Sequence, residues 1–130
     1  MIRLIYKIKS MLPTHFFFYL ALSCLLIHEM DAVRCKEWRI FPLVSLLEEK
    51  TGFQVFMLAH IPLFGLLFWA LIGSENPKNW IQGLNYFCIF HLLAHILFLQ
   101  HPENEFKDWL SWLWIIGAGL FGGLDLFFPF

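Results

Sequence analysis

The sequence predicts an all-α membrane bundle of four transmembrane helices, with a short interfacial helix between the first and the second. Three observations lead to this prediction. The 130 residues are 59% hydrophobic and only 15% charged, whereas a soluble domain carries about 25% charged residues. Four uncharged runs each approach the roughly 20 apolar residues that cross the hydrocarbon core of a bilayer. The runs are continuous rather than alternating, which favours helices over a membrane barrel.

We expect one membrane domain over residues 1–130, with spans at about residues 12–30, 53–73, 80–100 and 109–128. The first run follows a basic start, as a signal peptide does. However, no small-x-small cleavage site comes after it. We therefore interpret the first run as a retained membrane anchor.

The connections between the runs differ in length. Residues 73–77 (Gly-Ser-Glu-Asn-Pro) and 101–105 (His-Pro-Glu-Asn-Glu) are short polar turns, which make neighbouring helices antiparallel. The connection over residues 31–52 is longer and carries many charges. Within it, the apolar residues Leu43, Val44, Leu46 and Leu47 precede Glu48, a pattern that predicts a short helix lying at the membrane interface.

Ionisable residues gather toward one side of this bundle. Four alternating helices would bring together His28, Glu29, Asp31, His60, His91, His95 and His101. Such groups are costly at membrane depth, so they normally face the bundle interior and pair with one another. His91 and His95 are four residues apart and share one helix face. His28 and Asp31 are three apart and also share a face.

Two interpretations of this cluster stay open. In one, the residues bind zinc or another divalent transition metal through imidazole and carboxylate groups; the candidate ligands are His28, Asp31, His60, His91 and His95. In the other, a hydrogen-bond network fastens the helices with about 0.6–2 kcal/mol per bond. Asp31 bonded to His95, or Glu29 bonded to His60, would satisfy that network without a metal.

The function suggested by these residues is correspondingly general. The pattern favours a multi-pass membrane protein whose polar cluster has a structural or accessory role. The alternative is a metal-dependent membrane enzyme that acts on a lipid-like substrate, with a metal-bound water as nucleophile and Glu29 or Asp31 as general base. A transporter or proton relay ranks last, because the middle of each span is almost entirely apolar.

Partners follow from charge and from small residues. A net charge of −1 with thinly spread basic residues excludes nucleic acid, and membrane lipids are the expected surroundings. Gly119 and Gly123 form a small-xxx-small pair that allows close packing within the bundle. The same pair could instead serve a homo-oligomer or another membrane protein. Basic residues divide four against five between the two sides, so neither the orientation nor the kind of membrane follows from the sequence.

Two further features suggest ion pairs. Glu37-Trp38-Arg39 reads as an interfacial anchor, with Arg39 reaching a lipid phosphate or Glu29. Asp125 lies at the opposite end of the bundle, and its nearest predicted partners there are Arg3, Lys7 and Lys9. A structural ion pair or an interfacial position explains Asp125 better than proton transport.

In combination, these motifs are familiar. His28-Glu29-Met30-Asp31-Ala32, Glu37-Trp38-Arg39, the single His60, His91-x-x-x-His95 and His101-Pro102 resemble a family of small uncharacterised four-helix membrane proteins. They are more distantly similar to the bacterial membrane domain named for its HXXEE motif, although Asp and Ala stand at positions 31 and 32. The resemblance covers about residues 14–128. It implies the four-helix architecture and the importance of the polar cluster, but no activity.

Overall fold

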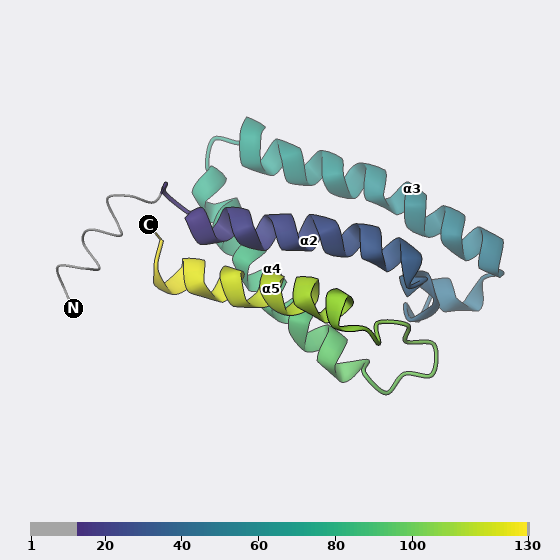
Figure 1. The fold of residues 1–130 in the computed structure, drawn as a ribbon. Helices are drawn as coiled ribbons and strands as arrows, with labels where there is room; N and C mark the ends of the chain where they lie inside the picture. The colour runs from purple at the N-terminus through teal and green to yellow at the C-terminus, as the bar shows by residue number, and fades with distance from the viewer. Residues whose placement is uncertain (1–12, 130) are drawn as a thin grey trace.

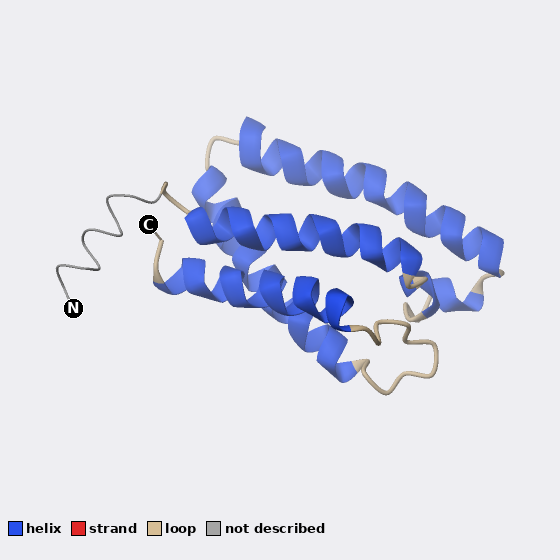
Figure 2. Ribbon diagram, in the orientation of Figure 1, coloured by secondary structure: helices blue, strands red, loops and turns tan. Residues whose placement is uncertain are grey.

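The computed structural model describes residues 13–129, which form four long helices and contain no strand (Figures 1 and 2). Successive helices run in opposite directions (Figure 1). Their bounds are α2 Phe16–Arg34, α3 Glu49–Phe68, α4 Pro77–Leu97 and α5 Trp109–Phe127. A π-helical turn, Trp69–Gly73, continues α3. The predicted all-α class is confirmed.

All four helices are long and apolar enough to cross a membrane. Much of their apolar surface faces outward. Leu58, Ile61, Phe90 and Leu97 are each more than 60% exposed. A soluble monomer rarely leaves so large a continuous apolar surface uncovered. The outer surface of the bundle therefore matches hydrocarbon better than water.

The first helix extends further than the sequence predicts. It ends at Arg34 rather than near residue 30, so Asp31 lies within the helix. The chain then turns at Lys36, whose φ of 52° lies in the left-handed region that stops a helix. The connection to α3 contains two short 3₁₀ helices, Glu37–Arg39 and Val44–Leu46, and only the second lies where a short helix is predicted.

Helix α5 packs against both α2 and α4. Gly119 and Gly122 are needed for the approach to α4. A Cβ added at Gly119 would lie 2.9 Å from the Cβ of Leu92, and one at Gly122 would lie 3.0 Å from the carbonyl oxygen of Asn85. A Cβ at Gly123 would meet its nearest neighbour, Ile89, only at 3.9 Å. Gly119 therefore packs within the bundle, whereas an oligomer formed through Gly119 and Gly123 stays a prediction.

Helix α3 stands apart from the other three helices (Figure 1). Among the described residues, its Cα atoms come within 8 Å of the rest only at the two 3₁₀ helices and at its own π-helical turn. Its middle is therefore joined to the bundle by side chains rather than by close backbone packing.

Asp125 connects α5 to α2 and α4 at the end of the bundle opposite to His28, His91 and His95. The side chain is 2% exposed. Its carboxylate lies 2.9 Å from Nδ1 of His15 and accepts hydrogen bonds from Asn85 Nδ2 at 2.8 Å and from the backbone amide of Phe18 at 3.2 Å. Asp125 therefore contacts His15, whereas an ion pair with Arg3, Lys7 or Lys9 stays a prediction, because these three lie outside the described residues.

Candidate metal centre

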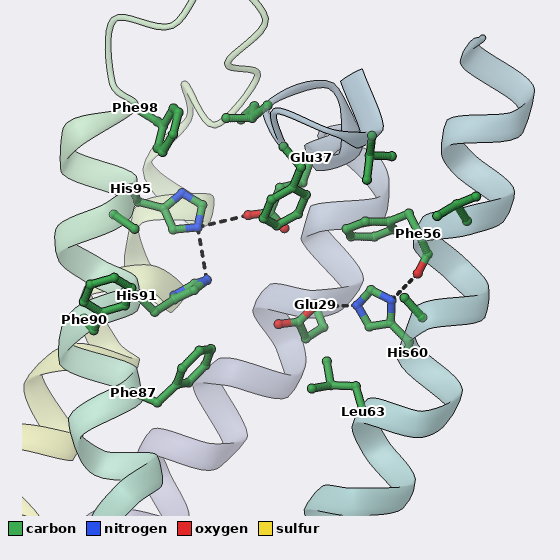
Figure 3. Close-up of a pocket in the computed structure, with 16 residues that line it drawn as sticks. Glu29, Glu37, Phe56, His60, Leu63, Phe87, Phe90, His91, His95 and Phe98 are labelled. Carbon is green, nitrogen blue, oxygen red and sulfur yellow. Dashed lines mark hydrogen bonds and ion pairs between the residues drawn. The ribbon is translucent and has the colours of Figure 1, made fainter. Parts of the chain in front are cut away.

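Three histidines and one glutamate converge near one end of the bundle. One possible ligand atom from each of His28, Glu37, His91 and His95 lies within 4.8 Å of all the others. Nε2 of His95 is 3.2 Å from Nε2 of His91 and 3.3 Å from Oε1 of Glu37. Figure 3 shows His91 and His95 directed from α4 toward the carboxylate of Glu37. We call these four residues the three-histidine cluster.

Each member is positioned by local structure. His91 and His95 are one turn apart on α4, and His28 lies on the face of α2 that meets them. Glu37 follows the left-handed turn at Lys36, which carries the chain past the end of α2 and directs the glutamate back toward α4. The Phe106 ring packs against His28 and His95, with centroid distances of 5.3 and 4.8 Å. The cluster is thus shielded by an apolar ring.

The spacing of these atoms agrees with part of a tetrahedral site. Zinc ligands at about 2.0–2.1 Å from the ion lie about 3.3–3.4 Å from one another at tetrahedral corners. The His95–His91 and His95–Glu37 distances of 3.2 and 3.3 Å match this edge length. His28 is the most distant member, with Nε2 3.9 Å from Oε1 of Glu37. Imidazole and carboxylate together form a donor set suited to zinc and related divalent metals.

Hydrogen bonds within the cluster leave polar atoms unpaired. His28 is 0% exposed, and neither of its ring nitrogens has a hydrogen-bond partner among the described residues. Nδ1 of His91 is also buried without a partner in this part of the chain. A buried polar group left unpaired costs about 1–3 kcal/mol. A metal ion coordinated by His28 would bind the lone pair of one of its ring nitrogens. The side chains of the described residues give that nitrogen no hydrogen bond.

Asp31 lies outside the three-histidine cluster. Its carboxylate accepts hydrogen bonds from Arg34 Nε at 2.6 Å and from Ser111 Oγ at 2.5 Å. Arg34 also bonds Asp108 at 2.7 Å. Asp31 therefore faces α5 rather than α4, and the predicted hydrogen bond between Asp31 and His95 is wrong.

His60 also lies outside the cluster and forms a second polar pair. Its Nε2 is 2.8 Å from Oε2 of Glu29, and its Nδ1 is 2.6 Å from the carbonyl oxygen of Phe56. The predicted Glu29–His60 hydrogen bond is confirmed. Because a carbonyl can only accept, Nδ1 carries a proton. A further proton must then lie between Nε2 and Glu29, on one group or the other.

A cavity of about 400 Å³ separates the two polar groups. Its volume is typical of small-molecule sites, which span about 300–1,000 Å³. Glu37, His91 and His95 reach it on one side, and Glu29 and His60 reach it on the other (Figure 3). The remaining lining is apolar: Ile40, Phe41, Val44, Val55, Phe56, Ala59, Leu63, Phe87, Phe90, Ala94 and Phe98.

Ion pairs of Arg39 hold the connection that carries Glu37. Arg39 binds Glu49 at 2.8 Å and lies 3.5 Å from Glu103. Of the two predicted partners of Arg39, Glu29 is therefore wrong, and a lipid phosphate stays a prediction. The hydrogen bond to Glu49 raises the pKa of Arg39. Burial, followed by the charge of Asp31, raises the pKa of the Cys35 thiol. Cys35, at the end of α2, is thus a buried and uncharged thiol.

The structure thus brings together three of the five predicted metal ligands, namely His28, His91 and His95. It adds Glu37, which sequence reasoning treated only as part of an interfacial anchor. One signal was available, since Glu37 is an acidic residue in the connection on the histidine-rich side. However, no periodicity relates a residue beyond the end of one helix to the face of another.

Comparison with known proteins identifies a family but no activity. A family of unknown function, DUF6713, matches residues 14–130. This match confirms the expected resemblance to an uncharacterised family, whereas the similarity to the HXXEE domain stays a prediction. No curated protein and no solved structure gives a significant match.

Proposed function

The chain belongs to this family of unknown function, and we propose that it is a multi-pass integral membrane protein with a metal-dependent activity toward a lipid-like substrate. The proposed metal ligands are His28, Glu37, His91 and His95, and zinc can expand to five-coordinate to take a water or a substrate oxygen. One observation carries the proposal: His28 is wholly buried beside two other imidazoles and a carboxylate, and neither of its ring nitrogens is hydrogen-bonded among the described residues.

The surroundings of the metal centre support a membrane location for the activity. The cavity beside the centre is lined mainly by aliphatic and aromatic side chains. The helices around it present apolar residues outward. A substrate that reaches this cavity sideways from a bilayer would be apolar over most of its length.

The chain also offers a group for proton transfer. Zinc, when bound, lowers the pKa of a coordinated water toward neutrality. Glu29 and His60 share a proton across 2.8 Å and line the same cavity as His91. Asp31, the other predicted base, is engaged by Arg34 and Ser111 and does not line this cavity. We therefore assign the general-base role to Glu29, supported by His60.

Metal analysis of the purified chain tests the proposal. The protein is extracted in mild detergent without chelator, loaded with zinc, and freed of excess metal. We expect about one tightly held ion per chain, because a site of four protein ligands binds zinc strongly. His91→Ala and His28→Ala should lose most of the ion. His101→Ala is the matched control and should retain it, because His101 lies in the connection after α4.

A second measurement separates metal binding from misfolding of the variants. Chelation of the wild-type protein should lower its melting temperature, and added zinc should restore it. A ligand at 100 times its dissociation constant stabilises the folded state by about 2.7 kcal/mol. The proposal would be overturned if the wild-type protein binds no zinc and its melting temperature changes with neither chelator nor zinc.

A structural or accessory role is the second candidate. It is favoured by the Glu29–His60 contact, which joins α3 to α2 where their backbones do not meet. In that case the three-histidine cluster would only stabilise the packing of the helices, without binding a metal. His91→Ala would then lower the melting temperature equally with and without zinc. A loss confined to the zinc-loaded protein would instead support the metal centre.

A further inference from the structure

A second, smaller cavity continues the first along α3. Its volume is about 140 Å³. The two cavities share Glu29, Leu63 and Phe87 in their linings. Beyond these shared residues, the described residues that line the second cavity are all apolar: Leu25, Leu26, Phe64, Leu66, Leu67, Ala70, Trp80 and Leu84. We call this smaller cavity the inner cavity, and the two cavities together the acyl groove.

Polarity falls steadily along the acyl groove. Glu37, His91 and His95 lie at one end, and Glu29 with His60 follows. Among residues 13–129, no ionisable side chain beyond Glu29 lines the inner cavity. A ligand that matches this gradient has one polar head and one long apolar tail. The smaller volume of the inner cavity favours a single chain over a two-chain lipid.

The charges at the end of the groove lined by Glu37, His91 and His95 indicate which polar head group a ligand would carry. No lysine or arginine lines either cavity, so this part of the chain offers no cationic side chain to a phosphate. A divalent ion held with the single carboxylate of Glu37 would leave about one net positive charge. Such a centre suits a carbonyl or carboxylate oxygen, because a metal ion acts on a carbonyl as a Lewis acid.

From this geometry we infer that the acyl groove binds one long-chain fatty acyl group, with its carbonyl end at the three-histidine cluster and its tail between α3 and α4. The inference rests on the proposed metal centre, which supplies the contact to the carbonyl oxygen. It deepens that proposal by naming the substrate class as a fatty acid or a fatty acyl ester.

Photo-crosslinking in the full-length protein tests this inference. The probe is a palmitic acid analogue with a diazirine near its methyl end, added to zinc-loaded protein in detergent. We expect the probe to label the inner cavity, near Leu66 on α3 and Leu84 on α4. Excess palmitic acid should suppress the labelling. Octanoic acid at the same concentration should suppress it much less, because a chain that leaves the inner cavity empty buries less apolar surface and binds more weakly.

Two leucines on α4 provide matched variants. Leu84 lines the inner cavity, whereas Leu93 is 52% exposed and lines neither cavity. Leu84→Trp should fill the groove and reduce competable labelling by about fivefold or more, a loss of roughly 1 kcal/mol in binding. Leu93→Trp should leave the labelling unchanged. If Leu84→Trp does not fold, competition in the wild-type protein decides the question.

Metal content is measured in the same samples, so that the two proposals fail separately. Bound zinc with labelling that is spread over the outer surface, and that palmitic acid does not suppress, overturns the acyl groove and leaves the metal centre standing. Competable labelling in protein without metal overturns the metal centre and supports only tail binding. Bound zinc with competable labelling at Leu84 supports both.

Discussion

The Nε2 atom of His60 lies 2.8 Å from Oε2 of Glu29 and joins the middle of α3 to α2. The backbones of these two helices do not approach within 8 Å among the described residues. The rings of Phe56 and Phe64 pack beside His60, with centroid distances of 4.5 and 5.4 Å. The start of α3 is held by the Arg39–Glu49 ion pair, whereas the middle of α3 is held over the cavity by the Glu29–His60 contact.

Removing this contact should loosen α3. We expect His60→Phe, which keeps an aromatic ring beside Phe56, to destabilise the protein by about 0.6–1.7 kcal/mol, the range of hydrogen bonds between membrane helices. Glu29→Gln should have a comparable effect. Thermal unfolding in detergent measures both, and the double variant reports their coupling. Strictly additive effects would mean that the contact contributes nothing.

Glycine substitutions on α5 should separate packed from open positions. Gly119→Ala and Gly122→Ala would place a Cβ against Leu92 and against the backbone of Asn85. Overpacking of this kind costs about 1–3 kcal/mol. Gly123→Ala is the matched control and should be neutral or slightly stabilising, because its Cβ would meet nothing closer than 3.9 Å. Equal melting temperatures for all three variants would contradict this packing.

Asp125 should be among the most sensitive polar positions. Its carboxylate accepts from Asn85 and from the backbone of Phe18, and contacts His15. Hydrogen bonds to a charged group contribute about 1.5–3 kcal/mol each. We expect Asp125→Ala to lower the free energy of unfolding by at least about 2 kcal/mol. Glu75→Ala, in the turn before α4, serves as control. Indistinguishable unfolding of these two variants would argue against the buried network.

Asp108 should make part of the stability depend on pH. Its carboxylate caps α5 by accepting from the backbone amide of Ser111, and it binds Arg34. The amide hydrogen bond, followed by Arg34, lowers the pKa of Asp108 below its ordinary value. Since the pKa is lower in the folded state, the stabilisation is present above the unfolded pKa of about 3.9 and is lost as pH falls through the folded value.

Asp108→Asn isolates this effect, because asparagine also caps helices well. The variant should be less stable than the wild type near pH 7, and the difference should shrink below about pH 4. Melting temperatures at both pH values measure the change. A difference that stays constant across this range would exclude Asp108 as its source.

The fold was largely predictable because one physical constraint dominates it. Residues 53–73 are too long and too apolar for anything but a span, and the turn at residues 73–77 forces the next helix to reverse. The same alternation predicted that His28, His91 and His95 would lie at a common depth. It also indicated the Glu29–His60 hydrogen bond, because few other polar groups are available at that depth.

Other parts of the site were decided only in three dimensions. Helical periodicity places His28 and Asp31 on overlapping faces, yet His28 points toward α4 and Asp31 toward α5. Their separation depends on how α2 is rotated between its neighbours, which no spacing within α2 encodes. Glu37 enters the cluster because Lys36 adopts a left-handed conformation, and that is a property of the packed connection.

The sequence by itself determined that four apolar helices alternate in direction and that imidazoles and carboxylates gather toward one end. The reason is local, since segment length, hydropathy and helical spacing act within each segment. The tertiary structure alone decided which of those groups meet, and that α3 stands away from α2 to leave a cavity beside them. Both outcomes depend on packing between segments, where Gly119, Phe106 and the Lys36 turn determine how closely the helices approach.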